Sequence, residues 1–96
     1  MKRETAITVG DHRGNSRIWL QGKWLVEFGF TRGKFWRVEY NSHVTITTAD
    51  SGRKISGKGD TPVLDMNSAK LSAIFQPGQS VLVTATPNKI TITKAK

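Results

Sequence analysis

Basic side chains in turn-forming segments are the residues of this sequence whose types are best suited to chemistry. Arg13 and Arg17 flank a run of turn residues, and Arg53, Lys54 and Lys58 lie in a glycine-rich segment. A guanidinium can donate two parallel hydrogen bonds to a phosphate or to a guanine edge, and lysines add phosphate contacts that do not depend on base sequence. The pattern predicts a surface that binds nucleic acid. The competing interpretation is that these are solvated surface charges.

Aromatic residues are a second group with binding chemistry. All three Trp, the single Tyr and three of the four Phe lie between positions 19 and 40. Aromatic rings stack on unpaired bases, but large apolar residues are few elsewhere, so we expect two of the three Trp in the core. Phe35 and Trp36 point to opposite faces of a regular strand, so one of them is exposed. We assign the stacking role to Trp36.

The two histidines are the remaining candidates for catalysis. His12 lies between Asp11 and Arg13, and His43 lies in a different turn. Such a pair can act as general acid and base beside a guanidinium that stabilises charge, but nothing in the sequence brings the two together, so no catalytic residue is assigned. Gly57-Lys58-Gly59 lacks the spacing of a phosphate-binding P-loop, and no cluster has metal-ligand spacing. We expect neither a metal nor another cofactor.

Length and charge set the class of protein that must position these residues. Ninety-six residues correspond to one small domain, which excludes a multidomain enzyme. Fifteen Lys and Arg against seven Asp and Glu leave a net charge of +8, which attracts polyanions. The absence of cysteine excludes disulfides and thiolate metal sites. No apolar run approaches the length of about 18 residues that spans a membrane. We expect a cytoplasmic protein without a membrane segment.

Apolar alternation predicts strands through most of the chain, interrupted by two short helices. In the first half we expect strands at 5–9, 16–21, 35–40 and 44–47 and a helix within 23–30. In the second half we expect a strand at 62–66, a helix capped by Asn67 or Ser68 that runs to Phe75, and strands at 80–84 and 89–93. The first half therefore reads as a ββαββ unit, and the second half repeats its sequence of strand, helix and hairpin.

The two halves also match each other in sequence. With a shift of 45, the segment 30–33 falls on 75–78, Val38 falls on Val83, and Ile18 falls on Val63. One additional residue in the last turn places Val44 and Ile46 on Ile90 and Ile92. We expect a first repeat at 1–48, a Gly- and Lys-rich linker at 49–60 with a short strand around Ile55, and a divergent second repeat at 61–96. The alternative is two unrelated β-rich stretches.

The segments 16–25 and 28–33, which contain Gly-Lys-Trp-Leu and Gly-Phe-Thr-Arg-Gly, resemble the SymE-like toxins, which are similar to the AbrB/MazE/SpoVT group of swapped-hairpin barrels. The resemblance covers 5–48 well and 61–94 weakly. It implies a mostly β fold with two short helices, in which tandem ββαββ-like repeats of one chain form a pseudo-symmetric AbrB-type barrel. An OB-like or Sm-like small barrel is the structural alternative.

The resemblance also implies a function. Arg17 matches an arginine that precedes the second strand of AbrB-like regulators and is similar to a DNA contact. Two basic helix positions of those regulators fall on Leu25 and Val26, and Arg17 itself aligns with Pro62 in the second half, so the binding face is incomplete and lopsided. Arg53, Lys54 and Lys58 are possible substitutes.

We therefore expect a DNA-binding protein of low to moderate sequence specificity in a transcriptional or nucleoid-associated role, with DNA placed ahead of RNA as the partner. The chain is either a pseudo-dimeric monomer or a homodimer. The alternatives are an RNA-directed toxin or endoribonuclease, and a protein-interaction module such as an antitoxin or a phage-type inhibitor.

Overall fold

Ten strands and two single-turn helices make up the computed structural model, which describes residues 2–95. In chain order they are β1 (Arg3–Thr8), β2 (Gly10–His12), β3 (Asn15–Gln21), α1 (Trp24–Glu27), β4 (Phe35–Tyr40), β5 (Val44–Ala49), β6 (Arg53–Lys54), β7 (Ser56–Lys58), β8 (Thr61–Asn67), α2 (Ala69–Ser72), β9 (Ser80–Thr86) and β10 (Lys89–Lys94). The expected mostly β fold with two short helices is confirmed.

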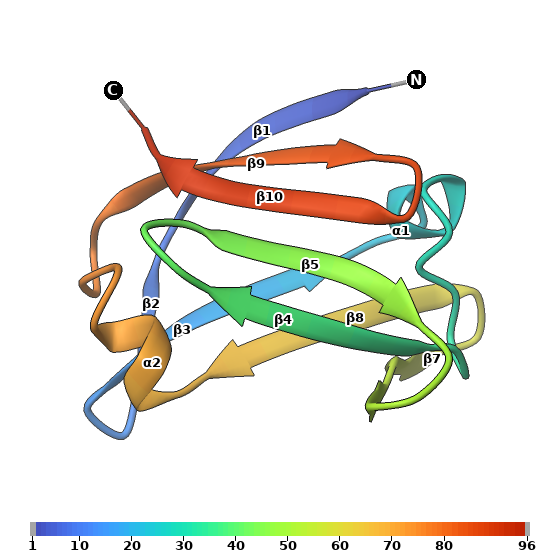
Figure 1. Ribbon diagram of the computed structural model, residues 1–96, viewed down its shortest axis with the longest axis horizontal. Helices are drawn as coiled ribbons and strands as arrows, with labels where there is room; N and C mark the ends of the chain where they lie inside the picture. The colour runs from blue at the N-terminus through green and yellow to red at the C-terminus, as the bar shows by residue number, and fades with distance from the viewer. Residues whose placement is uncertain (1, 96) are drawn as a thin grey trace.

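The strands form two antiparallel sheets (Figure 1). The six-stranded sheet has the order β1-β9-β10-β5-β4-β6, and the four-stranded sheet has the order β2-β3-β8-β7. Each strand of the first half has a counterpart five strands later in the chain, so that β1 corresponds to β6 and β5 to β10. If every strand is exchanged for its counterpart, each of the two strand orders is reversed. The central pairs, β5 with β10 and β3 with β8, each join the two halves of the chain.

The chain passes between the sheets at two buried residues, Val9 between β1 and β2 and Ile55 between β6 and β7. Val9 donates its N–H to the carbonyl of Gln79 and accepts a hydrogen bond from the N–H of Gly78. Ile55 makes the corresponding pair of bonds with Lys34 and Gly33. The segment 49–60, expected as a linker, therefore contributes two short strands and a core side chain.

The core lies between the sheets because the strands alternate apolar and polar residues. In β3, Ile18 and Leu20 point inward and are buried, whereas Arg17, Trp19 and Gln21 point outward. The largest fully buried side chains include Phe30 and Phe75, each of which follows a helix and is 0% exposed. Each helix also contributes one buried leucine. The core thus draws equally on both halves.

The register of β3 with β8 corrects the alignment of the two halves. Ile18 lies opposite Met66, and Leu20 lies opposite Leu64. Ile18 and Leu64 are buried and Val63 is not, so the burial pattern matches Ile18 with Leu64, a shift of 46. The shift of 45 is wrong in this strand, because a slip of one residue exchanges the two faces.

The helices are short, and α2 has a side-chain N-cap whereas α1 has none. Ser68 caps α2, with its hydroxyl accepting a hydrogen bond from the N–H of Leu71 at 3.2 Å, which decides between the two expected caps. α1 and α2 have four residues each.

Within residues 2–95, no helix is long and apolar enough to cross a membrane.

Candidate nucleic-acid interface

The outward side of the four-stranded sheet gathers aromatic and basic side chains. We call it the four-stranded face and define it by the outward residues His12 on β2, Arg17, Trp19 and Gln21 on β3, Lys58 on β7, and Val63 and Asp65 on β8. These residues face outward because their strand neighbours, such as Leu20 and Leu64, are buried between the sheets. Strand alternation alone therefore places an indole beside cationic groups.

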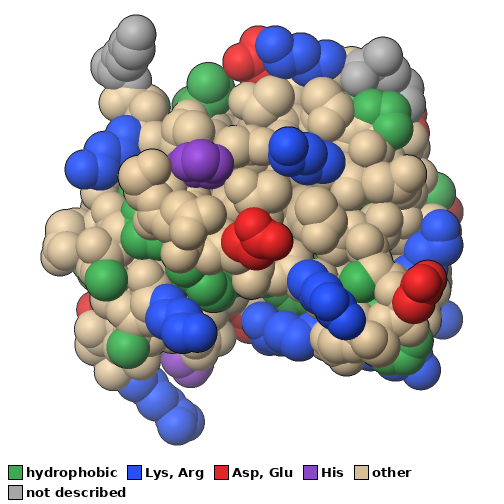
Figure 2. Space-filling model, viewed as in Figure 1, with side chains coloured by type: hydrophobic (Ala, Val, Ile, Leu, Met, Phe, Trp, Pro, Cys, Tyr) green, Lys and Arg blue, Asp and Glu red, His purple; other side chains and the backbone are tan. Residues whose placement is uncertain are grey.

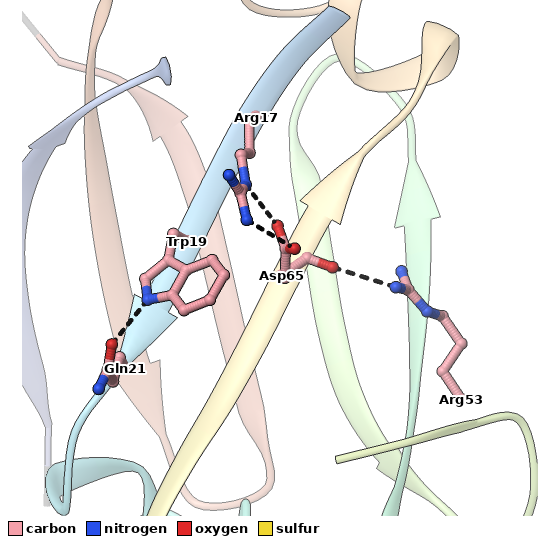
Figure 3. A network of polar contacts seen from close by, with 5 residues as sticks. All are labelled: Arg17, Trp19, Gln21, Arg53 and Asp65. Carbon is pink, nitrogen blue, oxygen red and sulfur yellow. Dashed lines mark hydrogen bonds and ion pairs between the residues drawn. The ribbon is translucent and has the colours of Figure 1, made fainter. Parts of the chain in front are cut away.

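Trp19 is the most exposed large hydrophobic residue of this face, with 47% of its surface accessible. The guanidinium carbon of Arg17 lies 4.7 Å from the centroid of its ring, within the range of a cation–π contact. The indole N–H donates to Oε1 of Gln21 at 2.8 Å. Figure 3 shows the indole between these two neighbours on β3. The ring is thus held in position while about half of it stays accessible.

Arg17 forms a two-pronged ion pair with Asp65 across the β3–β8 pair (Figure 3). Its Nε lies 2.9 Å from Oδ1 and its Nη2 lies 3.0 Å from Oδ2. The hydrogen bonds from Arg17 hold the pKa of Asp65 below its usual value, and the same bonds raise the pKa of Arg17. A guanidinium has five N–H groups, so the three that do not face Asp65 can still donate to a phosphate.

The Asp65 carboxylate predicts a stability that depends on pH. Since its pKa is lower in the folded chain than in the unfolded one, its contribution is present above pH 4 or so and is lost as the pH falls through the folded pKa. We expect Asp65→Asn to lower the urea midpoint at pH 7 and to make little difference at pH 2.5. Asp60→Asn is the control, since its pair with Lys23 is 75% exposed on both sides. A deficit as large at pH 2.5 as at pH 7 would contradict this.

Arg53 reaches the same face from the neighbouring sheet. Its Nη2 donates to the backbone carbonyl of Asp65 at 3.1 Å, and its guanidinium carbon lies 4.6 Å from the ring centroid of Trp36. Trp36 itself is 2% exposed, so the expected stacking role of Trp36 is wrong. In β4 the outward positions are taken by Arg37 and Glu39. Trp36 lies one and three positions from them, so strand alternation turns its indole inward, into the core.

The other predicted residues lie around this face. Arg13 is exposed in the β2–β3 turn, with a φ of 53°. Lys58 is exposed on β7 and belongs to the face. Lys54 is exposed on β6 at the edge of the six-stranded sheet. The structure thus brings Arg17, Arg53 and Lys58 to one face, with Arg13 at the tip of its hairpin.

A cleft of about 250 Å³ opens beside the indole. It is lined by Trp19, Gln21, Gly57, Lys58, Thr61 and Val63, and we call it the Trp19 cleft. A larger hollow of about 480 Å³ lies between β4 and α2, where Lys70 is the charged lining residue. Tyr40 also lines that hollow but is half-buried, so the Trp19 cleft differs in the exposure of its aromatic ring.

The opposite side of the molecule has a different character. Outward positions of β5, β9 and β10 are mainly threonines, with Thr91 paired to both Thr45 and Thr84. Figure 2 shows this side with mostly uncharged surface and with Lys and Arg side chains spread apart. The four-stranded face is therefore the better candidate for a binding surface.

The histidines do not form a site. His12 lies on β2 of the four-stranded sheet, and its charge contributes to the low pKa of Asp65. His43 lies in the turn between β4 and β5 of the six-stranded sheet. Among residues 2–95, no group of three or more His, Asp or Glu is arranged to hold a metal ion.

Sequence reasoning missed the two central residues of this face. Trp19 had a usable signal, because it alternates with the apolar Ile18 and Leu20 and so must point away from them. Asp65 had no local signal, since it is separated from Arg17 by 48 residues.

Comparisons of the chain with protein-family models, curated proteins and solved structures found no match.

Proposed function

We propose that this protein binds nucleic acid, DNA ahead of RNA, through the four-stranded face. The observation that carries the proposal is the exposed indole of Trp19 held against the guanidinium of Arg17, with Arg53 and Lys58 on the same face. Aromatic rings interleaved with cations suit a polymer of bases and phosphates. The role that fits is a small cytoplasmic DNA-binding protein of SymE/AbrB-like type, transcriptional or nucleoid-associated.

Electrostatics supports the same partner. The net charge of +8 draws polyanions toward the chain at long range. At short range, Arg17 keeps three N–H groups directed away from Asp65, and Arg13 projects from an exposed turn. Because phosphate contacts position the ligand without reading its sequence, this arrangement favours low sequence specificity.

The strand order supports a tandem origin for the fold. Within this proposal, each ββαββ unit is one half of an AbrB-type swapped-hairpin arrangement, and the chain acts as a pseudo-dimeric monomer. Support comes from the sheet orders that read the same in reverse under exchange of the halves and from the matching hydrogen bonds at Val9 and Ile55. A single unit has open strand edges and too small a core to be stable alone.

The salt dependence of binding tests the proposal. The slope of log K against log salt is about −0.9 per neutralised phosphate on duplex DNA and about −0.7 on single strands. Replacing both Arg17 and Lys58 by alanine is expected to make the slope shallower by about 1.4–1.8 if each contacts a phosphate. Fluorescence anisotropy with a labelled oligonucleotide at 50–200 mM salt measures this.

The matched control removes two charges from the other sheet. Arg37 and Lys89 are exposed on β4 and β10, and their double alanine variant has the same net charge as the first. We expect its slope to equal that of the unmodified protein. Equal changes in both variants would mean that only net charge matters and would remove the four-stranded face from the interface. Absence of binding to every nucleic acid at 50 mM salt would overturn the function itself.

A further inference from the structure

We propose that the Trp19 cleft takes an unpaired base, so that the preferred ligand of the four-stranded face is single-stranded nucleic acid and not a duplex. This inference rests on the proposed function and narrows it to a strand state. Trp19 is the residue that distinguishes the two strand states, and the cations beside it hold the adjoining backbone.

The ring of Trp19 is exposed and already fixed in position. With 47% of Trp19 accessible and its indole fixed by Arg17 and Gln21, little side-chain entropy is left to lose on binding. The bases of a duplex are stacked on one another and present only their edges in the grooves. An unpaired base has a free π-face, and the exposed indole of Trp19 can stack on it.

The Trp19 cleft has the size and lining that suit a single base. Pockets for drug-sized ligands measure about 300–1,000 Å³, and the Trp19 cleft, at about 250 Å³, is suited to a smaller group. Trp19 and Val63 supply apolar walls, and Gln21 and Thr61 add polar groups. A planar base with polar edges has this combination of properties.

Gly57 is a lining position of the cleft at which only glycine fits. Its φ is +136°, and a Cβ atom at this position would collide with the backbone carbonyl oxygen of Thr61. The cleft therefore lacks a side chain at one of its lining positions. Backbone approach of a ligand is a recognised reason for glycine in a strand.

Two cationic side chains, one lining the cleft and one on its aromatic ring, complete the site. Lys58 lines the cleft itself, and the guanidinium of Arg17 lies on the ring of Trp19. A base on the indole thus has two cations nearby that can contact the adjoining phosphates. Both contacts are independent of sequence, whereas the stacking contact requires an unpaired base.

The test compares a ten-nucleotide oligo-dT with a ten-base-pair duplex at equal salt, using anisotropy of a labelled strand. We expect the protein to bind oligo-dT more tightly. Trp19→Ala is expected to weaken oligo-dT binding by about 5- to 160-fold, since stacking contributes about 1–3 kcal/mol per base, and to leave the salt slope unchanged. Trp19→Phe keeps a stacking ring and is expected to restore most of the affinity.

Phe35→Ala is the matched control, because Phe35 is a half-buried aromatic residue on the other sheet, and circular dichroism verifies that each variant is folded. If oligo-dT and duplex bind equally well, or if Trp19→Ala binds oligo-dT as the unmodified protein does, the inference is overturned while the proposed function stands. If neither nucleic acid binds, the proposed function fails and the inference fails with it.

Discussion

Replacing Phe30 or Phe75 with alanine is expected to lower the free energy of unfolding by about 3–5 kcal/mol in each case. Both residues are 0% exposed. The backbone N–H of each donates a hydrogen bond of 2.9 Å to a carbonyl of the preceding helix, from Phe30 to Leu25 and from Phe75 to Leu71. Small domains are stable by only about 5–15 kcal/mol in total. Either substitution therefore removes a large share of the stability, which urea unfolding followed by circular dichroism measures.

Val26→Ala is the control for this pair, because Val26 is 41% exposed on α1 and surface substitutions usually change stability by about 0.5 kcal/mol or less. Similar losses for Phe30→Ala and Phe75→Ala would indicate that the two halves contribute equally to one core. A loss below about 1 kcal/mol for Phe75→Ala alone would contradict this and would mean that the first half holds most of the stability.

Gly57→Ala is expected to lower the free energy of unfolding by about 2–3 kcal/mol, because a non-glycine residue at φ +136° is strained. The added methyl group would also collide with the carbonyl oxygen of Thr61. Thr61 is on the neighbouring strand β8, where Gly57 of β7 lies opposite Pro62. Relief of the collision requires the two strands to move apart. We therefore also expect weaker oligo-dT binding, since Gly57 lines the Trp19 cleft.

Gly59→Ala separates conformational strain from collision. Gly59 has a φ of +58°, in the left-handed region that other residues can adopt, and a Cβ atom there meets nothing within 4 Å. The expected loss is about 1 kcal/mol, with oligo-dT binding retained. Thermal unfolding of the two variants side by side measures the difference. Equal losses would show that the close approach of Thr61 to Gly57 has no energetic consequence.

Local sequence patterns were sufficient to predict most of the elements. Alternation in segments such as 16–21 and 89–93 follows from the period of two in a strand that covers a core on one side. The spacing of Trp24, Leu25 and Phe28 predicted a helix, and the glycines after it agree with the short α1. These predictions succeeded because each depends only on neighbours within a few positions.

The choice between faces was harder to make from sequence. Phe35 and Trp36 point to opposite faces of β4, and the only signal for which face is buried is that Arg37 and Glu39 share the face of Phe35. In the folded chain Trp36 fills the core beside β6, with Arg53 stacked over it. β6, a strand of two residues, brings Arg53 opposite Trp36.

The sequence by itself determined the order of the longer strands and of the two helices, and the positive charge, because these follow from composition and from contacts close along the chain. Only the tertiary structure decided that β3 pairs with β8, that Arg17 meets Asp65 across 48 residues, and that Arg53 crosses from one sheet to the other. Pairing between distant strands depends on the packing of the whole core, and no local pattern records it. The candidate interface consists of such long-range pairs, which is why its basic residues could be predicted but its centre could not.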